Sequence, residues 1–133
     1  ADTLTFHIET ALHAHRICLK IKEMGKRAGI ALNPSTHWNA IEFLLGEIDV
    51  VTVMTVNPGF SRQNHLNFVH DKIAQLNEYR KKHNLKFEIQ VDGGINSENI
   101  AKIKSLGVNA VIAGGAVFNS KDYQDAVQQL KNA

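Results

Sequence analysis

A strand-like run followed by a helix-length segment recurs five times along this chain, and this alternation is what most restricts its fold. The runs are short and rich in β-branched residues, and each following segment is long enough to cross back over a sheet. The order predicts a parallel α/β architecture with right-handed crossovers. The predicted strands are residues 3–7, 28–32, 50–56, 87–91 and 110–113, and the predicted helices are residues 10–24, 36–45, 68–83, a segment beginning at Asn96 or Ser97, and 122–130.

Five such units allow two closures of the sheet. A doubly wound open sheet would be complete with five strands, whereas a (β/α)₈ barrel of ~250 residues needs about three more units. The chain has 133 residues and opens at Ala1, directly in strand-like sequence. That beginning suggests a cut through something larger. No linker interrupts the alternation, so we expect one domain or part of one, and the pattern alone leaves both closures open.

Charge and cysteine content exclude several classes of function. Basic residues number 15 against 13 acidic ones, and residues 80–82 form the only short basic cluster. This distribution of charge lacks the basic stripe that nucleic-acid or anionic-membrane binding requires. The single cysteine, Cys18, forms no intramolecular disulfide and is expected to pack in the core, and no apolar run approaches the ~20 residues of a membrane span. We therefore expect a cytoplasmic protein with no nucleic-acid or membrane partner.

Polar residues and glycines occur at the end of each predicted strand, where parallel α/β sheets bind their ligands. Glycines there let backbone amides approach an anion, because no Cβ intervenes. The series predicts a phosphate site; the alternative is that each glycine merely permits a tight turn. The strand-end residues are His7 and Glu9, Asn33, Met54 with Asn57-Pro58-Gly59, Asp92-Gly93-Gly94, and Gly114-Gly115.

Asp92 directly follows a predicted strand, so its carboxylate is expected to face the mouth of the sheet. There it can act as a base or as a metal ligand. The alternative is a structural Asx turn onto the amides of the next two residues.

The seven histidines show no metal-ligand spacing. His7 ends a strand, and both a structural and a binding role remain open for it. We expect the others to be mostly solvated, in loops or on helix surfaces, including His37, His65, His70 and His83.

Five strand-end segments together resemble the ribulose-phosphate 3-epimerase family, over essentially the whole chain. The third is the most specific of them. The segments are Thr5-Phe6-His7-x-Glu9, Ala28-Gly29-x-Ala31-Leu32-Asn33-Pro34-x-Thr36, Val53-Met54-Thr55-Val56-Asn57-Pro58-Gly59-Phe60, Val91-Asp92-Gly93-Gly94-Ile95 and Ala113-Gly114-Gly115-Ala116-Val117-Phe118.

The resemblance implies a complete parallel (β/α)₈ TIM barrel in the α/β class. This chain would supply about five strand-helix units, the fourth to the eighth, so that residues 1–133 are the C-terminal part of a single ribulose-phosphate-binding barrel domain. The resemblance also implies a divalent metal, Zn or Fe(II), held by two histidines and two aspartates. Only Asp92 matches one of those ligands here, so the other three would lie outside this chain.

The implied reaction inverts C3 of a ketose phosphate, converting D-ribulose 5-phosphate to D-xylulose 5-phosphate through an enediolate. Asp92 would be one of two aspartates that exchange the proton. By the same resemblance Met54 lies near the intermediate, His7 near the substrate and the loop glycines against the phosphate. The implied substrate-binding residues are His7, Met54, Gly59, Phe60, Gly93, Gly94, Gly114 and Gly115.

Two departures from the family pattern leave the substrate open. Ser61-Arg62 stands where the family usually has two glycines, and Gly114-Gly115 stands where Gly-Ser is common. Arg62 could grip a phosphate or point to solvent. The alternatives are an epimerase of a six-carbon ketose phosphate such as D-allulose 6-phosphate, or an inactive phosphate-binding remnant. We expect a sugar-phosphate partner and allow for a homo-oligomer.

Overall fold

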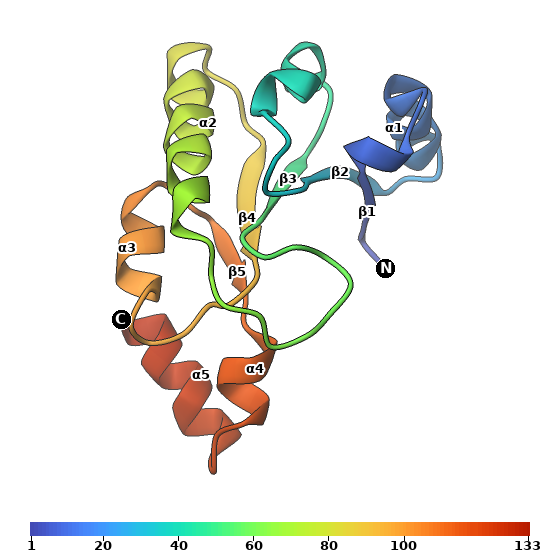
Figure 1. The fold of residues 1–133 in the computed structure, drawn as a ribbon. Helices are drawn as coiled ribbons and strands as arrows, with labels where there is room; N and C mark the ends of the chain where they lie inside the picture. Colours follow the sequence, from blue (N-terminus) through green and yellow to red (C-terminus); the bar gives the residue numbers. More distant parts are fainter.

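The computed structural model describes residues 1–133 and contains one sheet of five parallel strands in the order β1-β2-β3-β4-β5 (Figure 1). The strands are β1 (Thr3–His7), β2 (Arg27–Leu32), β3 (Val50–Met54), β4 (Glu88–Asp92) and β5 (Ala110–Ile112). The α-helices are α1 (Ala14–Glu23), α2 (His70–Lys82), α3 (Ile100–Ser105), α4 (Gly114–Phe118) and α5 (Tyr123–Asn132). Three 3-10 helices, η1 (Ile8–Thr10), η2 (Trp38–Leu44) and η3 (Asn67–Val69), complete the chain.

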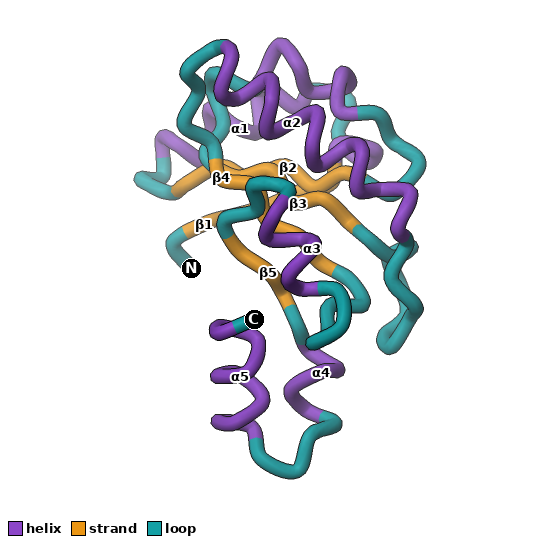
Figure 2. The backbone as a smooth tube through the Cα atoms, turned by 90° about the vertical axis from the view of Figure 1, so that its left-hand side faces the viewer, coloured by secondary structure: helices purple, strands orange, loops and turns teal.

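The strand order decides between the two closures that the sequence allowed. A doubly wound sheet reverses its strand order at a switch point and carries helices on both faces. Here every strand pairs only with its neighbours in sequence, always in parallel. Helices α1 and α2 accordingly lie on the same side of the sheet (Figure 2). The sheet is therefore wound in one direction, as in a (β/α)₈ barrel, and the open doubly wound alternative is excluded.

The core lies between the sheet and the helices. Alternate strand residues, such as Val51 and Val53 on β3, are buried in one cluster with helix residues such as Ile73, Leu76 and Ile103. Because successive strand side chains point to opposite faces, the residues between them face the other side of the sheet. On that face the C-terminal residues of three strands are in register: Met54 pairs with Asp92, and Asp92 with Ile112.

Several predicted boundaries shift in the structure. Residues 10–24 do not form one helix: η1 ends at Thr10, whose hydroxyl donates to the carbonyl of His7, and α1 starts at Ala14. Leu12, an apolar residue inside the predicted helix, lies between the two and is 92% exposed. The helix predicted over 36–45 is the 3-10 helix η2, where the His37 ring accepts a hydrogen bond from the Asn39 amide.

Two further boundaries follow from side-chain hydrogen bonds. The strand predicted over 50–56 ends at Met54, and the hydroxyl of the next residue, Thr55, donates to the backbone carbonyls of Asp92 and Gly93. The helix expected at Asn96 or Ser97 begins at Ile100, since the Asn96 side chain accepts from the amides of Glu98 and Asn99 and forms a turn first. Asp92 is itself the last residue of β4 rather than the residue after it.

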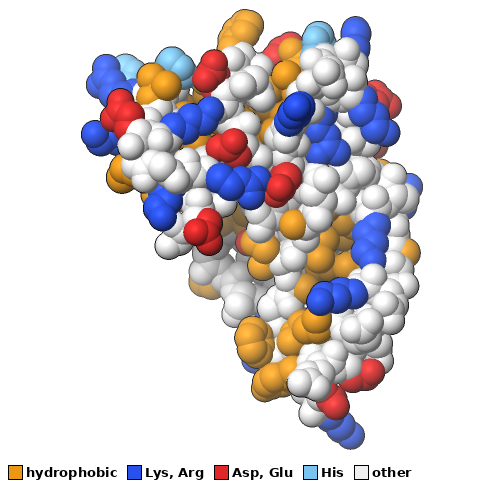
Figure 3. Space-filling view, turned by 180° about the vertical axis from the view of Figure 1, so that it is seen from behind, with side chains coloured by type: hydrophobic (Ala, Val, Ile, Leu, Met, Phe, Trp, Pro, Cys, Tyr) orange, Lys and Arg blue, Asp and Glu red, His pale blue; other side chains and the backbone are white.

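Charged side chains of both signs are mixed over the face seen in Figure 3, without a continuous patch of one sign. None of the helices has the length and apolar character needed to cross a membrane.

Candidate functional site

Asp92 presents an unpaired carboxylate at the C-terminal edge of the sheet. It lies on the face opposite the helices, in register with Met54. Its carboxylate oxygens accept no hydrogen bond, whereas its backbone carbonyl accepts from the amide and hydroxyl of Thr55, so the structural Asx-turn alternative does not apply. Burial raises the pKa of the Asp92 carboxyl group. A half-buried carboxyl group with a raised pKa and no internal partner is suited to accept a proton or to bind a cation.

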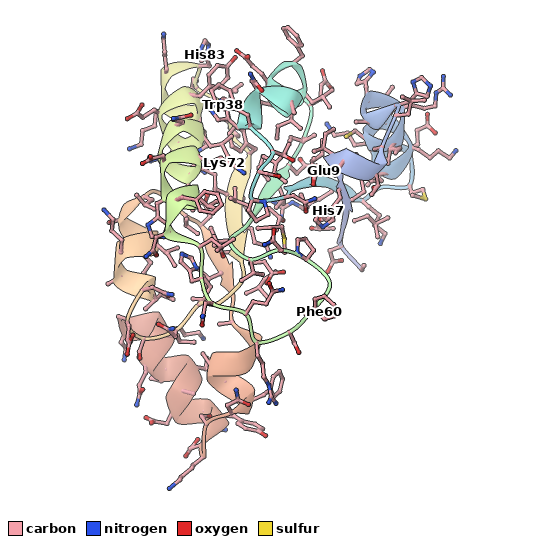
Figure 4. All side chains as sticks on the ribbon, in the orientation of Figure 1. His7, Glu9, Trp38, Phe60, Lys72 and His83 are labelled. Carbon is pink, nitrogen blue, oxygen red and sulfur yellow. The ribbon has the colours of Figure 1, made fainter.

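A hollow of about 490 Å³ opens beside Asp92, between the loop after β3 and the start of α4. Its walls include most of the predicted site residues, together with Arg62 and His65. The predicted residues in its lining are Phe60, Asp92, Gly93, Gly94, Gly114 and Gly115. Phe60 stands on the outer turn of the loop, far from the helical layer (Figure 4), and is 85% exposed. A second hollow of about 400 Å³, between α5 and the loop before α3, contains none of the predicted residues.

The backbone requires glycine at some positions around the hollow and not at others. Gly93 and Gly94 have φ of +130° and +65°, and a Cβ would lie 2.5 Å from Val56 Cγ2 and 2.7 Å from the His65 backbone nitrogen, respectively. The backbone therefore requires glycine at both positions. Gly114 has no atom within 4 Å of such a Cβ, and Gly115 only Asn119 Nδ2 at 3.7 Å. The tight-turn alternative thus fails for this last pair, which leaves bare backbone facing the hollow at the first turn of α4.

His7, Met54 and Gly59 do not line this hollow. His7 Nδ1 lies 3.4 Å from Oε1 of Glu9, and that oxygen accepts the Asn33 amide at 2.9 Å. This second polar cluster joins the ends of β1 and β2 (Figure 4), and Asn33 Oδ1 is buried within it without a hydrogen-bond partner. Gly59 lies in the loop after β3, with φ of +121° and open space around it.

Lys72 on α2 belongs to the same cluster and was missed at the sequence level. Its Nζ donates to the carbonyls of Asn33 at 2.8 Å and of Pro34 at 2.9 Å. Burial lowers the pKa of the Lys72 ammonium group, while Glu9 acts in the opposite direction. Nothing local in the sequence distinguishes this lysine from the solvated lysines of the same helix.

The expectation that His65 and His70 are solvated surface residues is wrong. Their rings are half-buried, with the two Nε2 atoms 2.7 Å apart, and His65 Nδ1 lies 2.9 Å from the carbonyl oxygen of Gly93. The sequence shows only two histidines five residues apart, because the contact depends on how the loop after β3 meets α2.

Arg62 has φ of +61°, in the left-handed region that favours glycine. This is one of the two positions where the family pattern has glycine, and the backbone keeps a glycine-type conformation although arginine occupies it. The exposed side chain belongs to the wall of the hollow.

The residues of this chain do not form a complete metal centre. No group of three or more His, Cys, Asp or Glu side chains converges anywhere in it. The unpaired carboxylate of Asp92 fits the role of one ligand, and further ligands would have to come from other segments.

The parallel sheet, wound in one direction and carrying a hollow at its strand ends, places the chain among the TIM-barrel proteins. Solved structures agree: 3-hexulose-6-phosphate synthase from Salmonella typhimurium superposes with a TM-score of 0.75 at 22% identity, over 99% of this chain and 61% of that one. Orotidine 5'-monophosphate decarboxylase from Sulfolobus solfataricus gives 0.67 at 14% identity, over 99% and 60%. At these identities the likeness concerns the fold alone.

The chain belongs to the ribulose-phosphate 3-epimerase family, whose sequence model matches residues 1–118. Ribulose-phosphate 3-epimerase from Helicobacter pylori (strain 26695) is 39% identical over 129 residues, which are 97% of this chain and 59% of that protein. The chloroplastic enzyme of Arabidopsis thaliana is 39% identical over 98% of this chain and 47% of its own length. This chain thus spans about half to three-fifths of these relatives, and its family is one of isomerases.

Proposed function

We propose that the complete protein carrying this chain is a metal-dependent epimerase that inverts C3 of D-ribulose 5-phosphate to give D-xylulose 5-phosphate. Residues 1–133 would be the C-terminal part of its single barrel domain, and other segments would supply the remaining units. The observation that carries the proposal is the unpaired, half-buried carboxylate of Asp92 beside a hollow walled by glycine loops. The names of the relatives support the choice of substrate.

In this proposal Asp92 holds and moves the proton at C3. Its carboxylate takes the C3 proton from one face of the substrate, and in the reverse direction the protonated carboxyl group returns it. The pKa of Asp92, raised by burial, favours this exchange because it brings the group closer to neutral pH. An acid from outside this chain would serve the opposite face. Met54, in register beside Asp92, would line the same side of the reacting carbons.

The substrate's phosphate would lie against the bare backbone of the loops. Gly94, Gly114 and Gly115 line the hollow, and backbone amides at glycines can bind an anion without a Cβ in the way. Zn²⁺ or Fe²⁺, held by Asp92 with ligands from outside this chain, would supply the positive charge that stabilises the oxyanion formed on deprotonation.

The test is conversion of D-ribulose 5-phosphate by the metal-loaded complete protein in D₂O, followed by proton NMR. We expect D-xylulose 5-phosphate with deuterium at C3, and a rate loss of at least ~10²-fold in Asp92→Asn. Asp71→Asn, on the exposed side of α2, is the matched control and should retain the wild-type rate. Absence of conversion by the wild type, or an unchanged rate in Asp92→Asn, would refute the proposal. Faster turnover of D-allulose 6-phosphate would reassign the substrate to the six-carbon class.

A further inference from the structure

A series of hydrogen bonds connects helix α2 to the glycine loop after β4. His70, the first residue of α2, contacts His65 with 2.7 Å between the two Nε2 atoms. His65 Nδ1 in turn lies 2.9 Å from the carbonyl oxygen of Gly93. That oxygen also accepts the hydroxyl of Thr55 at 2.6 Å, so both of its lone pairs are used.

Because the last acceptor is the carbonyl oxygen of Gly93, the positions of the protons on His65 and His70 are fixed. A carbonyl oxygen can only accept, so His65 must carry its proton on Nδ1. Nε2 of a neutral His65 is then a lone pair, and His70 must donate to it from Nε2. At 2.7 Å the two Nε2 atoms can share one proton but cannot both carry one. His70 therefore selects the tautomer of His65 that can hold Gly93.

Holding the carbonyl of Gly93 also orients the amide of Gly94. The two groups belong to one trans peptide, so they point in opposite directions. The carbonyl points toward Thr55 and His65, and the Gly94 N–H therefore points away from them. That amide makes no hydrogen bond within the protein, and Gly94 lines the hollow.

We infer that His65 is a positioning residue for the phosphate site: it holds the Gly93–Gly94 peptide so that the Gly94 amide faces the ligand, and His70 fixes its tautomer. This inference rests on the proposed function only for the identity of the ligand, the phosphate of the substrate.

The electrostatic surroundings favour a pair that is not fully protonated. Burial lowers the pKa of the His70 imidazole, and the neighbouring charges of His65 and Lys102 act in the same direction, whereas Asp71 opposes them. Full protonation of both rings would place two N–H groups against each other. The positioning contact is therefore expected to persist at neutral pH.

Four substitutions distinguish loss of the hydrogen-bond donor from loss of the imidazole ring at His65 and at His70. His65→Asn keeps a nitrogen donor close to the position of Nδ1 but cannot reach His70, and His65→Leu removes the donor. His70→Gln keeps a donor close to the position of Nε2, and His70→Leu removes it. His15→Leu, on the exposed face of α1, is the matched control.

The measurements are the Kd of inorganic phosphate for the complete protein, and KM and kcat with the sugar phosphate. In His65→Leu we expect Kd and KM to rise about tenfold, equivalent to ~1.4 kcal/mol, with kcat changed by less than about threefold. His65→Asn and His70→Gln should stay within about threefold of wild type, and His70→Leu should fall between these limits. His15→Leu should have no effect. Unchanged phosphate binding in His65→Leu, or equal losses in His65→Leu and His65→Asn, would overturn the inference.

A spectroscopic measurement decides the case without any variant. In ¹⁵N NMR of the wild-type protein we expect His65 as the Nδ1–H tautomer, and an Nε2–H tautomer would overturn the inference. Phosphate binding and the tautomer are both measured without turnover. A protein that lacks epimerase activity but shows these signals would refute the proposed function and leave the positioning role standing.

Discussion

The ammonium group of Lys72 on α2 donates to the carbonyl oxygen of Asn33 at the end of β2, across 2.8 Å. A second bond reaches the carbonyl of Pro34 at 2.9 Å. Together they tie a helix to the loop that follows the strand one unit earlier, and they fix the backbone beside Glu9, whose carboxylate accepts the Asn33 amide.

Lys72→Met should lower the free energy of unfolding by about 1–3 kcal/mol, because two carbonyls lose a charged donor that burial has partly desolvated. Urea denaturation followed by circular dichroism measures this change. Lys81→Met, on the exposed surface of the same helix, is the control and should alter stability by less than about 0.5 kcal/mol. Equal effects of the two substitutions would show that the Lys72 contacts add nothing to stability.

Asp92→Asn should stabilise the metal-free protein at neutral pH while it abolishes activity. Burial raises the pKa of Asp92 in the folded state, so folding is favoured below the unfolded value of 3.8 and is penalised as pH rises through the folded-state pKa. The amide carries no charge and avoids that penalty. Urea unfolding at pH 7 should therefore give a higher stability for the variant than for the wild type, with the difference shrinking toward pH 4. A variant that is less stable at pH 7 would contradict this account.

The effect of the Arg62 backbone on stability and the effect of its side chain on substrate binding can be measured separately. Its left-handed conformation costs a non-glycine residue roughly 1–2 kcal/mol, so Arg62→Gly should be more stable than Arg62→Ala by about 1 kcal/mol. Both variants lose the guanidinium group, and we expect both to raise KM for the sugar phosphate about tenfold and to weaken inhibition by inorganic phosphate. If neither constant moves, Arg62 is a surface residue.

His70 should make the protein less stable in mild acid. Because its pKa is lowered in the folded state, the unfolded chain binds a proton first as pH falls below about 6.5, and stability is lost between that value and the folded-state pKa. Thermal unfolding at pH 7.5, 6.5 and 5.5 measures this loss, and His70→Gln should reduce it. The control His15→Leu should keep the wild-type pH dependence.

The repeating pattern predicted the strands and most strand-end residues because their signals are local. A β-branched run such as residues 50–54 predicts a buried strand without any other part of the chain. Glycine after a helical segment likewise predicts the helix end, and Gly25 has φ of +70° directly after Met24, the C-cap of α1. The burial of Cys18 in the core was likewise predicted from its apolar neighbours and is confirmed. The direction of winding was not predictable from the pattern, since both closures have the same order of elements.

The polar contacts between elements could not be predicted from the sequence, for a physical reason. The spacing of His65 and His70 predicts solvated side chains, because it does not show that the loop after β3 contacts α2. Nothing in the sequence near Lys72 distinguishes it from other lysines on the surface of a helix. Side-chain hydrogen bonds also moved the helix starts: Asn96 satisfies two amides in a turn before α3 begins, which helix propensity alone does not reveal. These features depend on tertiary geometry rather than on residue spacing.

The strictly sequential strand order has a consequence for the way the chain acquires its structure. Each strand from β2 to β5 docks against the strand made just before it, so none of these four has to wait for a partner from a distant part of the sequence. Contacts between neighbouring units close short loops and carry a small entropic cost, which favours rapid growth of the sheet in the direction of synthesis. On a ribosome, β1 and β2 can pair while the glycine loop after β4 is still inside the exit tunnel.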